Sequence, residues 1–183
     1  MEAFLTSMAL VAVAEIGDKT QLLSFALAAR LRKPWPIIAG ILLATLANHA
    51  LAGWLGVLIA AHLDARAQRW VTAIAFFAFA LWALKPDALE AAPERSRGGP
   101  LLTTLVAFFI VEMGDKTQLA TVALAARYES LAAVVLGTTV GMMIANVPAV
   151  LIGERLAARL DMRLMRLMAA GLFAATGVLA LLA

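Results

Sequence analysis

The length of its uncharged segments is the feature that most constrains how this chain can fold. Residues 37–61 and 130–152 contain no lysine, arginine, aspartate or glutamate. A helix needs about 20 mainly apolar residues to cross a hydrocarbon core roughly 30 Å thick. Charged residues make up only 15% of the 183 residues and hydrophobic ones 63%, whereas soluble domains average about a quarter and a half. We therefore predict an all-α integral membrane protein.

Six membrane spans fit the pattern of apolar and polar segments. They cover residues 3–29, 36–61, 67–86, 101–126 and 130–152, followed by a sixth span that begins after a basic connection at 155–166. Segment 87–100 mixes proline, glycine, glutamate and arginine, and is the one plausible linker. The predicted units are residues 1–86 and 101–183, with the linker 87–100 between them.

The two halves of the chain repeat each other at an offset of 97 residues. Residues 15–30 read EIGDKTQLLSFALAAR and residues 112–127 read EMGDKTQLATVALAAR, with twelve of sixteen positions identical. Three spans per repeat is an odd number, so the second copy must enter the membrane from the opposite side. This predicts two inverted-topology three-helix repeats, an arrangement that recurs in transporters with midplane binding sites.

The basic residues between the spans favour one orientation. If the connections alternate between the two faces, ten basic residues fall on the side that holds the linker and three on the other. By the positive-inside rule, the linker is predicted to be cytoplasmic and both termini outside. Since the basic residues are scattered between apolar runs, the net charge of +3 does not indicate a nucleic-acid partner. The absence of cysteine excludes disulfides and thiolate metal sites.

Four acidic residues lie deep inside the predicted spans: Glu15, Asp18, Glu112 and Asp115. Each pair is about twelve residues, or roughly 18 Å, from either end of its span, where an ionised group costs at least about 2.5–3.5 kcal/mol. Residues i and i+3 share one helix face, and a pseudo-twofold axis would bring both pairs into one pocket. Carboxylates that close cannot all stay ionised without a cation or protons. The pattern predicts a cation/proton exchange site, and oxygen ligands suit hard divalent ions.

The other motif residues each allow a functional and a structural interpretation. Gly17 and Gly114 permit either a kink or close helix packing. Lys19 and Lys116 either neutralise neighbouring acids or occupy the empty site until metal displaces them. Gln21, Gln118, Thr20 and Thr117 supply neutral oxygen atoms. These oxygens either ligate the metal or form hydrogen bonds between helices.

Three further polar residues lie near the predicted midplane: Asn48, His49 and Asn146. His49 and Asn146 occupy equivalent positions of the two repeats. An intramembrane histidine can be a metal ligand or a proton carrier, and a packing role is at least as common. The methionines near residues 142 and 162–168 are interpreted as packing residues.

The doubled segments resemble the signature of the GDT-type cation exchangers (the transmembrane protein 165-like family), which is Glu-x-Gly-Asp-(Lys/Arg)-(Thr/Ser) once per three-helix half. Residues 15–20 and 112–117 both match it without departure. The resemblance implies export of Mn²⁺, and Ca²⁺ as a second substrate, in exchange for protons, with no resident cofactor. It also implies functional importance for the four acids. No organellar targeting extension is visible before the first span, which favours the plasma (inner) membrane of a prokaryote.

Other functions are compatible with part of the pattern. An exporter of a cationic organic solute would also use carboxylates, although two lysines in the site would repel such a cargo. An intramembrane lipid-phosphate hydrolase would need an arginine or a nucleophile–base pair beside the acids, so we predict a transporter and not an enzyme. A passive channel is not distinguished from coupled exchange by sequence. The alanine- and glycine-rich spans permit a homodimer without requiring one.

Overall fold

The computed structural model describes residues 1–86, 98–128, 130–152 and 161–182. Those residues form helices and no strand, which confirms the all-α prediction. The helices are α1 (Glu2–Glu15), α2 (Lys19–Leu31), α3 (Pro34–Ala60), α4 (Ala65–Ala83), α5 (Gly99–Glu112), α6 (Lys116–Tyr128), α7 (Leu131–Ile152) and α9 (Met162–Leu182). Residues 87–97 of the predicted linker and residues 155–160 of the basic connection lie outside the described residues.

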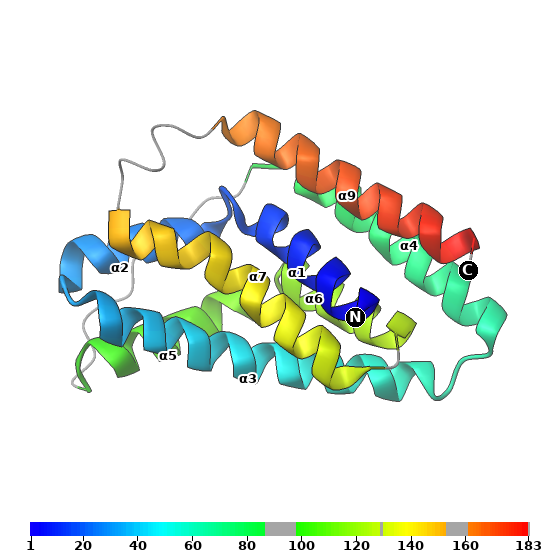
Figure 1. Ribbon diagram of the computed structural model, residues 1–183, viewed down its shortest axis with the longest axis horizontal. Helices are drawn as coiled ribbons and strands as arrows, with labels where there is room; N and C mark the ends of the chain where they lie inside the picture. The colour runs from blue at the N-terminus through cyan, green and yellow to red at the C-terminus, as the bar shows by residue number, and fades with distance from the viewer. Residues whose placement is uncertain (87–97, 129, 153–160, 183) are drawn as a thin grey trace.

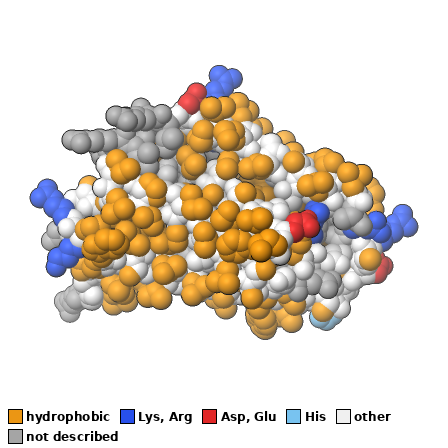
Figure 2. All heavy atoms as spheres, viewed as in Figure 1, with side chains coloured by type: hydrophobic (Ala, Val, Ile, Leu, Met, Phe, Trp, Pro, Cys, Tyr) orange, Lys and Arg blue, Asp and Glu red, His pale blue; other side chains and the backbone are white. Residues whose placement is uncertain are grey.

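Three of these helices, α3, α7 and α9, are long and apolar enough to cross a membrane. Hydrophobic side chains also cover most of the molecular face in Figure 2, and charged ones gather mainly at its margins. Large apolar residues such as Trp35, Leu81 and Ile74 point outward, as expected where lipid replaces water. The chain is a membrane protein.

The predicted first and fourth spans are each two helices joined by a break. Helix α1 ends at Glu15 and α2 begins at Lys19, while α5 ends at Glu112 and α6 begins at Lys116. Gly17 and Gly114 lie in the breaks with φ of 83° and 75°, a left-handed conformation that costs other residues about 1–2 kcal/mol. The prediction that Glu15 and Asp18 share one face of a continuous helix was wrong, because Asp18 instead caps the start of α2.

The two repeats use the same close helix contact twice. Helix α5 packs on α3, and α1 packs on α7. A Cβ atom on Gly40 would lie 2.8 Å from the carbonyl oxygen of Leu101, and one on Gly137 would lie 2.5 Å from that of Phe4. Each residue of one pair is 97 positions from its counterpart in the other, so the duplication extends from the sequence to the packing.

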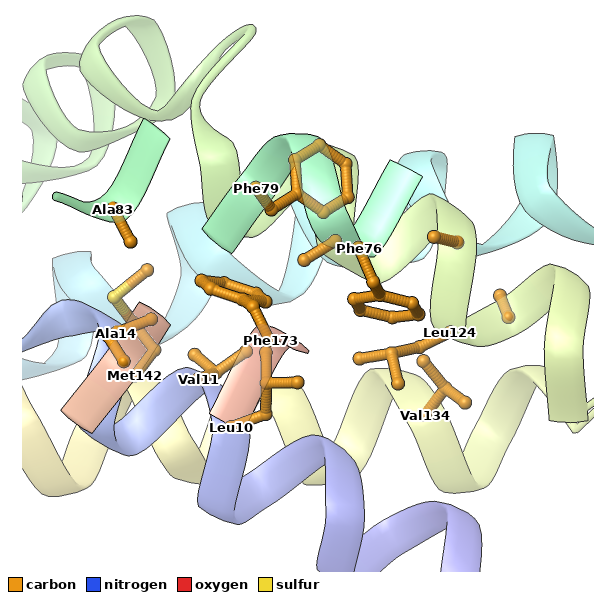
Figure 3. Close-up of a cluster of buried hydrophobic side chains, with 14 of the residues drawn as sticks. Leu10, Val11, Ala14, Phe76, Phe79, Ala83, Leu124, Val134, Met142 and Phe173 are labelled. Carbon is orange, nitrogen blue, oxygen red and sulfur yellow. The ribbon is translucent and has the colours of Figure 1, made fainter. Parts of the chain in front are cut away.

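Helices α4 and α9 lie along each other and close one side of the bundle (Figure 1). Their interface is aromatic: Phe76 and Phe79 of α4 face Phe173 of α9, with ring centroids 5.9–6.3 Å apart (Figure 3). Helix α9 also packs on α1, and α4 packs on α6. This pair therefore covers α1 and α6, which adjoin the two breaks.

Candidate functional site

The two helix breaks bring acidic residues of both repeats together in the interior. Glu15, Asp18, Glu112 and Asp115 are each at most 1% exposed. Glu15, Glu112 and Asp115 each offer an oxygen atom, and these three atoms lie within 4.8 Å of one another. Two opposite ligands of a calcium ion are separated by roughly 4.6–5.2 Å. The cluster therefore has the dimensions of a divalent-cation site.

The lysines of the two motifs pair crosswise between the repeats. Lys19 Nζ lies 2.9 Å from Asp115 Oδ1, and Lys116 donates to Asp18 Oδ1. In a continuous helix, Lys19 could have paired with Glu15, four residues earlier. The break separates these two residues, and Lys19 pairs with Asp115 of the other repeat instead. Each aspartate is thus held by the other half of the molecule.

The two crosswise pairs differ in exposure. The Lys116 side chain is 3% exposed and that of Lys19 is 25% exposed. A small pocket lies beside Asp18 and Lys116, and Arg166 of α9 contributes to its lining. The Lys116–Asp18 pair is therefore almost fully buried beside this pocket, and the Lys19–Asp115 pair is more exposed.

The threonines and glutamines of the motifs hold the breaks in place. Thr117 Oγ1 donates to Glu112 Oε1 at 2.7 Å, and Thr20 Oγ1 donates to Glu15 in the same way. Gln21 Oε1 accepts from the backbone N–H of Gly17 at 2.9 Å, and Gln118 Oε1 accepts from that of Gly114 at 2.7 Å. These bonds satisfy amide groups that the interrupted helices leave without helical partners.

The glutamine amide groups also anchor the breaks to the long helices. Gln21 Nε2 donates to the carbonyl oxygen of Ala145 in α7, and Gln118 Nε2 donates to Asn48 Oδ1 in α3, at 3.0 and 3.3 Å. Asn48 and Ala145 are equivalent positions of the two repeats. The site is thus built from α1, α2, α5 and α6 and is supported by α3 and α7.

The other midplane candidates differ in their hydrogen bonding. Asn146 accepts from Ser24 Oγ at 2.7 Å and donates to the carbonyl oxygen of Met142 at 3.1 Å. His49 lies with Nε2 3.7 Å from Glu112 Oε1, and neither of its ring nitrogens has a hydrogen-bond partner within the described part of the chain. Sequence reasoning missed Ser24, whose only signal is a polar residue one turn after Gln21 on the same helix.

Helix ends add to the electrostatics of the site. Helices α2 and α6 begin directly after Asp18 and Asp115, and the partial positive charge of a helix N-terminus stabilises a nearby carboxylate. Asp18 accepts from the backbone N–H of Thr20 at 3.4 Å. By contrast, no described residue donates a hydrogen bond to Glu15 Oε1 or Glu112 Oε2. These two oxygens retain the capacity to bind an ion.

The two breaks are covered to different extents. A Cβ atom on Gly17 would lie 2.7 Å from Sδ of Met162, the first residue of α9, whereas one on Gly114 would meet no atom of the described chain within 4 Å. Met113, beside Gly114, is 60% exposed. The surroundings of the site are therefore less symmetric than its motifs.

Comparison with known proteins identifies relatives over nearly the whole chain. The family model "Divalent cation/proton antiporter GDT1" matches residues 3–91 and 100–183. A Vibrio cholerae protein named "Putative manganese exporter" is 52% identical over 174 residues, which cover 94% of this chain and 87% of that protein. "GDT1-like protein 5" of Arabidopsis thaliana is 30% identical over 224 residues, which cover 100% of this chain and 96% of that protein. No solved structure matches the chain.

The family model covers both motifs and all the helices that build the buried site. Its description names ion exchange and no chemical reaction, so the match supports neither a lipid-phosphate hydrolase nor an exporter of organic cations. The chain belongs to the GDT1 family of divalent cation/proton antiporters.

Proposed function

We propose that the protein exports Mn²⁺, with Ca²⁺ as a second substrate, in exchange for protons at the buried carboxylate cluster. The main support for this proposal is the buried cluster of Glu15, Glu112 and Asp115, in which one carboxylate oxygen of each residue lies within 4.8 Å of the other two. The 52% identical Vibrio protein bears the name of a manganese exporter, which supports Mn²⁺ as the principal ion. The ion itself is the transported substrate.

The charges of the site support exchange of one doubly charged ion for protons. The four acids carry four formal negative charges when ionised, and Lys19 and Lys116 carry two positive ones. The remaining two negative charges are neutralised by one divalent cation or by two protons. A site that is neutral in both loaded states avoids the cost of moving a net charge through the low-dielectric interior.

We assign the ligands from these contacts. Glu15, Asp18, Glu112 and Asp115 bind the ion, and the two aspartates exchange their lysine partners for metal as it enters. The amide oxygens of Gln21 and Gln118 each accept a hydrogen bond from the glycine N–H of a break with one lone pair. The second lone pair of each oxygen is available to the ion. Thr20 and Thr117 orient the glutamates through their hydroxyl groups.

The proposed architecture is six spans in two inverted repeats. The first contains α1 with α2, α3 and α4, and the second contains α5 with α6, α7 and α9. The repeated Gly40 and Gly137 contacts and the crosswise lysine pairs support it. We place the protein in the inner membrane of a prokaryote with both termini outside and the linker 87–100 cytoplasmic. The site is assembled from one chain, so the proposal does not depend on a homodimer.

In the transport cycle, the carboxylates bind metal from the cytoplasm, release it outside and return protonated. Alternating access of the site to the two faces is what inverted repeats provide in other transporters.

Transport by purified protein in proteoliposomes tests this function. Mn²⁺ uptake driven by a pH gradient is expected in the unmodified protein and is expected to be lost in Glu15→Gln and Asp115→Asn. Glu2→Gln removes an exposed carboxylate at the start of α1 and is the matched control, with uptake retained. Unchanged uptake in the two site variants would contradict the proposed site.

A further inference from the structure

His49 is a buried imidazole without hydrogen-bond partners in the middle of α3. Its side chain is 0% exposed, and neither Nδ1 nor Nε2 has a hydrogen-bond partner among the residues that the structure describes. A buried polar group left without a partner costs about 1–3 kcal/mol, and the large majority of buried polar atoms are satisfied. A buried histidine without hydrogen bonds therefore indicates a role other than helix packing.

The equivalent residue of the other repeat shows what a packing role looks like. Asn146 accepts from Ser24 Oγ and donates to the backbone of α7, so its amide group is satisfied on both sides. Helix α3 gives His49 no such bonds, and its neighbour one turn earlier, Thr45, also has an unpartnered Oγ1. Helix packing therefore accounts for Asn146 and does not account for His49.

His49 lies beside Glu112 and outside the group of Glu15, Glu112 and Asp115 oxygen atoms that lie within 4.8 Å of one another. Its Nε2 is 3.7 Å from Glu112 Oε1, too long for a hydrogen bond, which is typically 2.7–3.2 Å. Two atoms that share a first-row metal ion at bonds of about 2.1 Å are separated by roughly 3–4 Å. Glu112 Oε1 already accepts from Thr117, and Oε2 is the oxygen of this carboxylate to which no described residue donates, so the distance matches two side chains that ligate one ion better than it matches two groups bonded to each other.

We propose that His49 is a nitrogen ligand of the transported ion and that it makes the site prefer Mn²⁺ to Ca²⁺. This inference rests on the proposed function. Calcium takes oxygen ligands, whereas sets of glutamate and histidine hold iron or manganese in helical bundles. Glu15, Glu112 and Asp115 supply oxygens that either ion accepts, while His49 supplies the single nitrogen that discriminates between them.

Competition between the two ions tests the selectivity. His49→Asn gives the first repeat the residue that the second repeat carries at the equivalent position. We expect this variant to lose at least about tenfold in Mn²⁺ transport relative to Ca²⁺ transport in proteoliposomes, by analogy with the 10–100-fold loss of metal affinity when a group that merely supports a metal ligand is changed. An equal loss for both ions, or no loss, would overturn the proposal.

Pulsed electron paramagnetic resonance of bound Mn²⁺ tests ligation directly and does not require a variant to fold. The chain has two histidines, and the second, His62, is exposed, with Nδ1 2.8 Å from the carbonyl oxygen of Leu58. With ¹⁵N-labelled histidine, the unmodified protein and His62→Asn should both show coupling of the manganese electron spin to a histidine nitrogen, and His49→Asn should not. Bound Mn²⁺ without this coupling in the unmodified protein would refute the ligand assignment.

The two failures are distinguishable. If the unmodified protein transports Mn²⁺ but shows no histidine coupling, only the role of His49 is wrong. If it transports neither Mn²⁺ nor Ca²⁺, the proposed function itself is wrong.

Discussion

At the scale of single residues, the crosswise lysine pairs differ most in how much solvent reaches them. Lys116 is almost fully enclosed with Asp18, while a quarter of Lys19 is exposed beside Asp115. Removal of one partner from an enclosed ion pair costs about 3–5 kcal/mol, whereas the loss is smaller where water can solvate the remaining charge. We expect Lys116→Met to lower the thermal unfolding temperature in detergent more than Lys19→Met does. An equal or reversed order would mean that the pairs do not differ in this way.

The sequence predicted which residues would be buried together but not how they would pair. The four acids could be found because ionisable groups in apolar spans are costly and rare. The pairing of Lys116 with Asp18 joins residues 98 positions apart and depends on how the repeats meet, so no local spacing indicates it. Ser24 has no sequence feature that distinguishes it from an ordinary small polar residue of a membrane helix.

At the scale of helices, the breaks depend on glycines with a left-handed backbone. Gly114 and Gly99 have nearly the same φ, 75° and 78°, and a Cβ atom on either would meet no atom of the described residues within 4 Å. Substitution by alanine at either position therefore carries the same backbone cost, about 1–2 kcal/mol. We expect Gly114→Ala to abolish most transport because it misaligns Glu112 and Asp115, and Gly99→Ala, at the start of α5, to retain it. Comparable Mn²⁺ uptake by the two variants in proteoliposomes would contradict this role of the break.

The close helix contacts give a second prediction at this scale. A Cβ atom on Gly137 would clash with the backbone of α1 at 2.5 Å, whereas one on Gly171, in α9, would meet no described residue within 4 Å. We expect Gly137→Ala to destabilise the protein by roughly 1–3 kcal/mol, as overpacking does. Gly171→Ala should be neutral or slightly stabilising because alanine favours helix. Equal thermal stability of the two variants in detergent would contradict the packing of α1 on α7.

Hydropathy found the helical segments but not their interruptions. An apolar segment of 20 to 27 residues has the same composition whether it forms one helix or two. The signal that could have located the breaks is local, since glycine followed by an aspartate N-cap is a typical helix start. In both motifs, the glutamine three residues after the aspartate completes that signal by bonding the glycine N–H.

At the scale of the whole molecule, the duplication predicted a common site, and the structure brings the two motifs together. Two nearly identical motifs cannot by themselves predict an asymmetric surrounding. Helix α9 packs on α1 and α4 on α6, and among the described residues no comparable packing joins α4 to α5 or α9 to α2, the equivalent pairs. The structure is therefore more open at Gly114 than at Gly17. This difference arises from the packing of α1, α4, α6 and α9 and not from the motif residues.

The charge balance of the site also gives a prediction for the whole molecule. Because two net negative charges are neutralised either by one divalent cation or by two protons, each cycle is expected to move no net charge across the membrane. Mn²⁺ transport at a fixed pH gradient should then be unchanged when the membrane potential of proteoliposomes is set by potassium and valinomycin. A transport rate that changes steeply with the membrane potential would contradict this charge balance and would show that each cycle moves net charge across the membrane.

Simultaneous recording of Mn²⁺ and pH inside proteoliposomes tests the central claim most directly, because one buried site must carry both ions in turn. An outward Mn²⁺ gradient imposed at equal pH should drive protons inward, and an imposed pH gradient should accumulate Mn²⁺ against its own gradient. Movement of Mn²⁺ only down its gradient, with no accompanying change in pH, would contradict exchange at a shared carboxylate site and would indicate a passive channel.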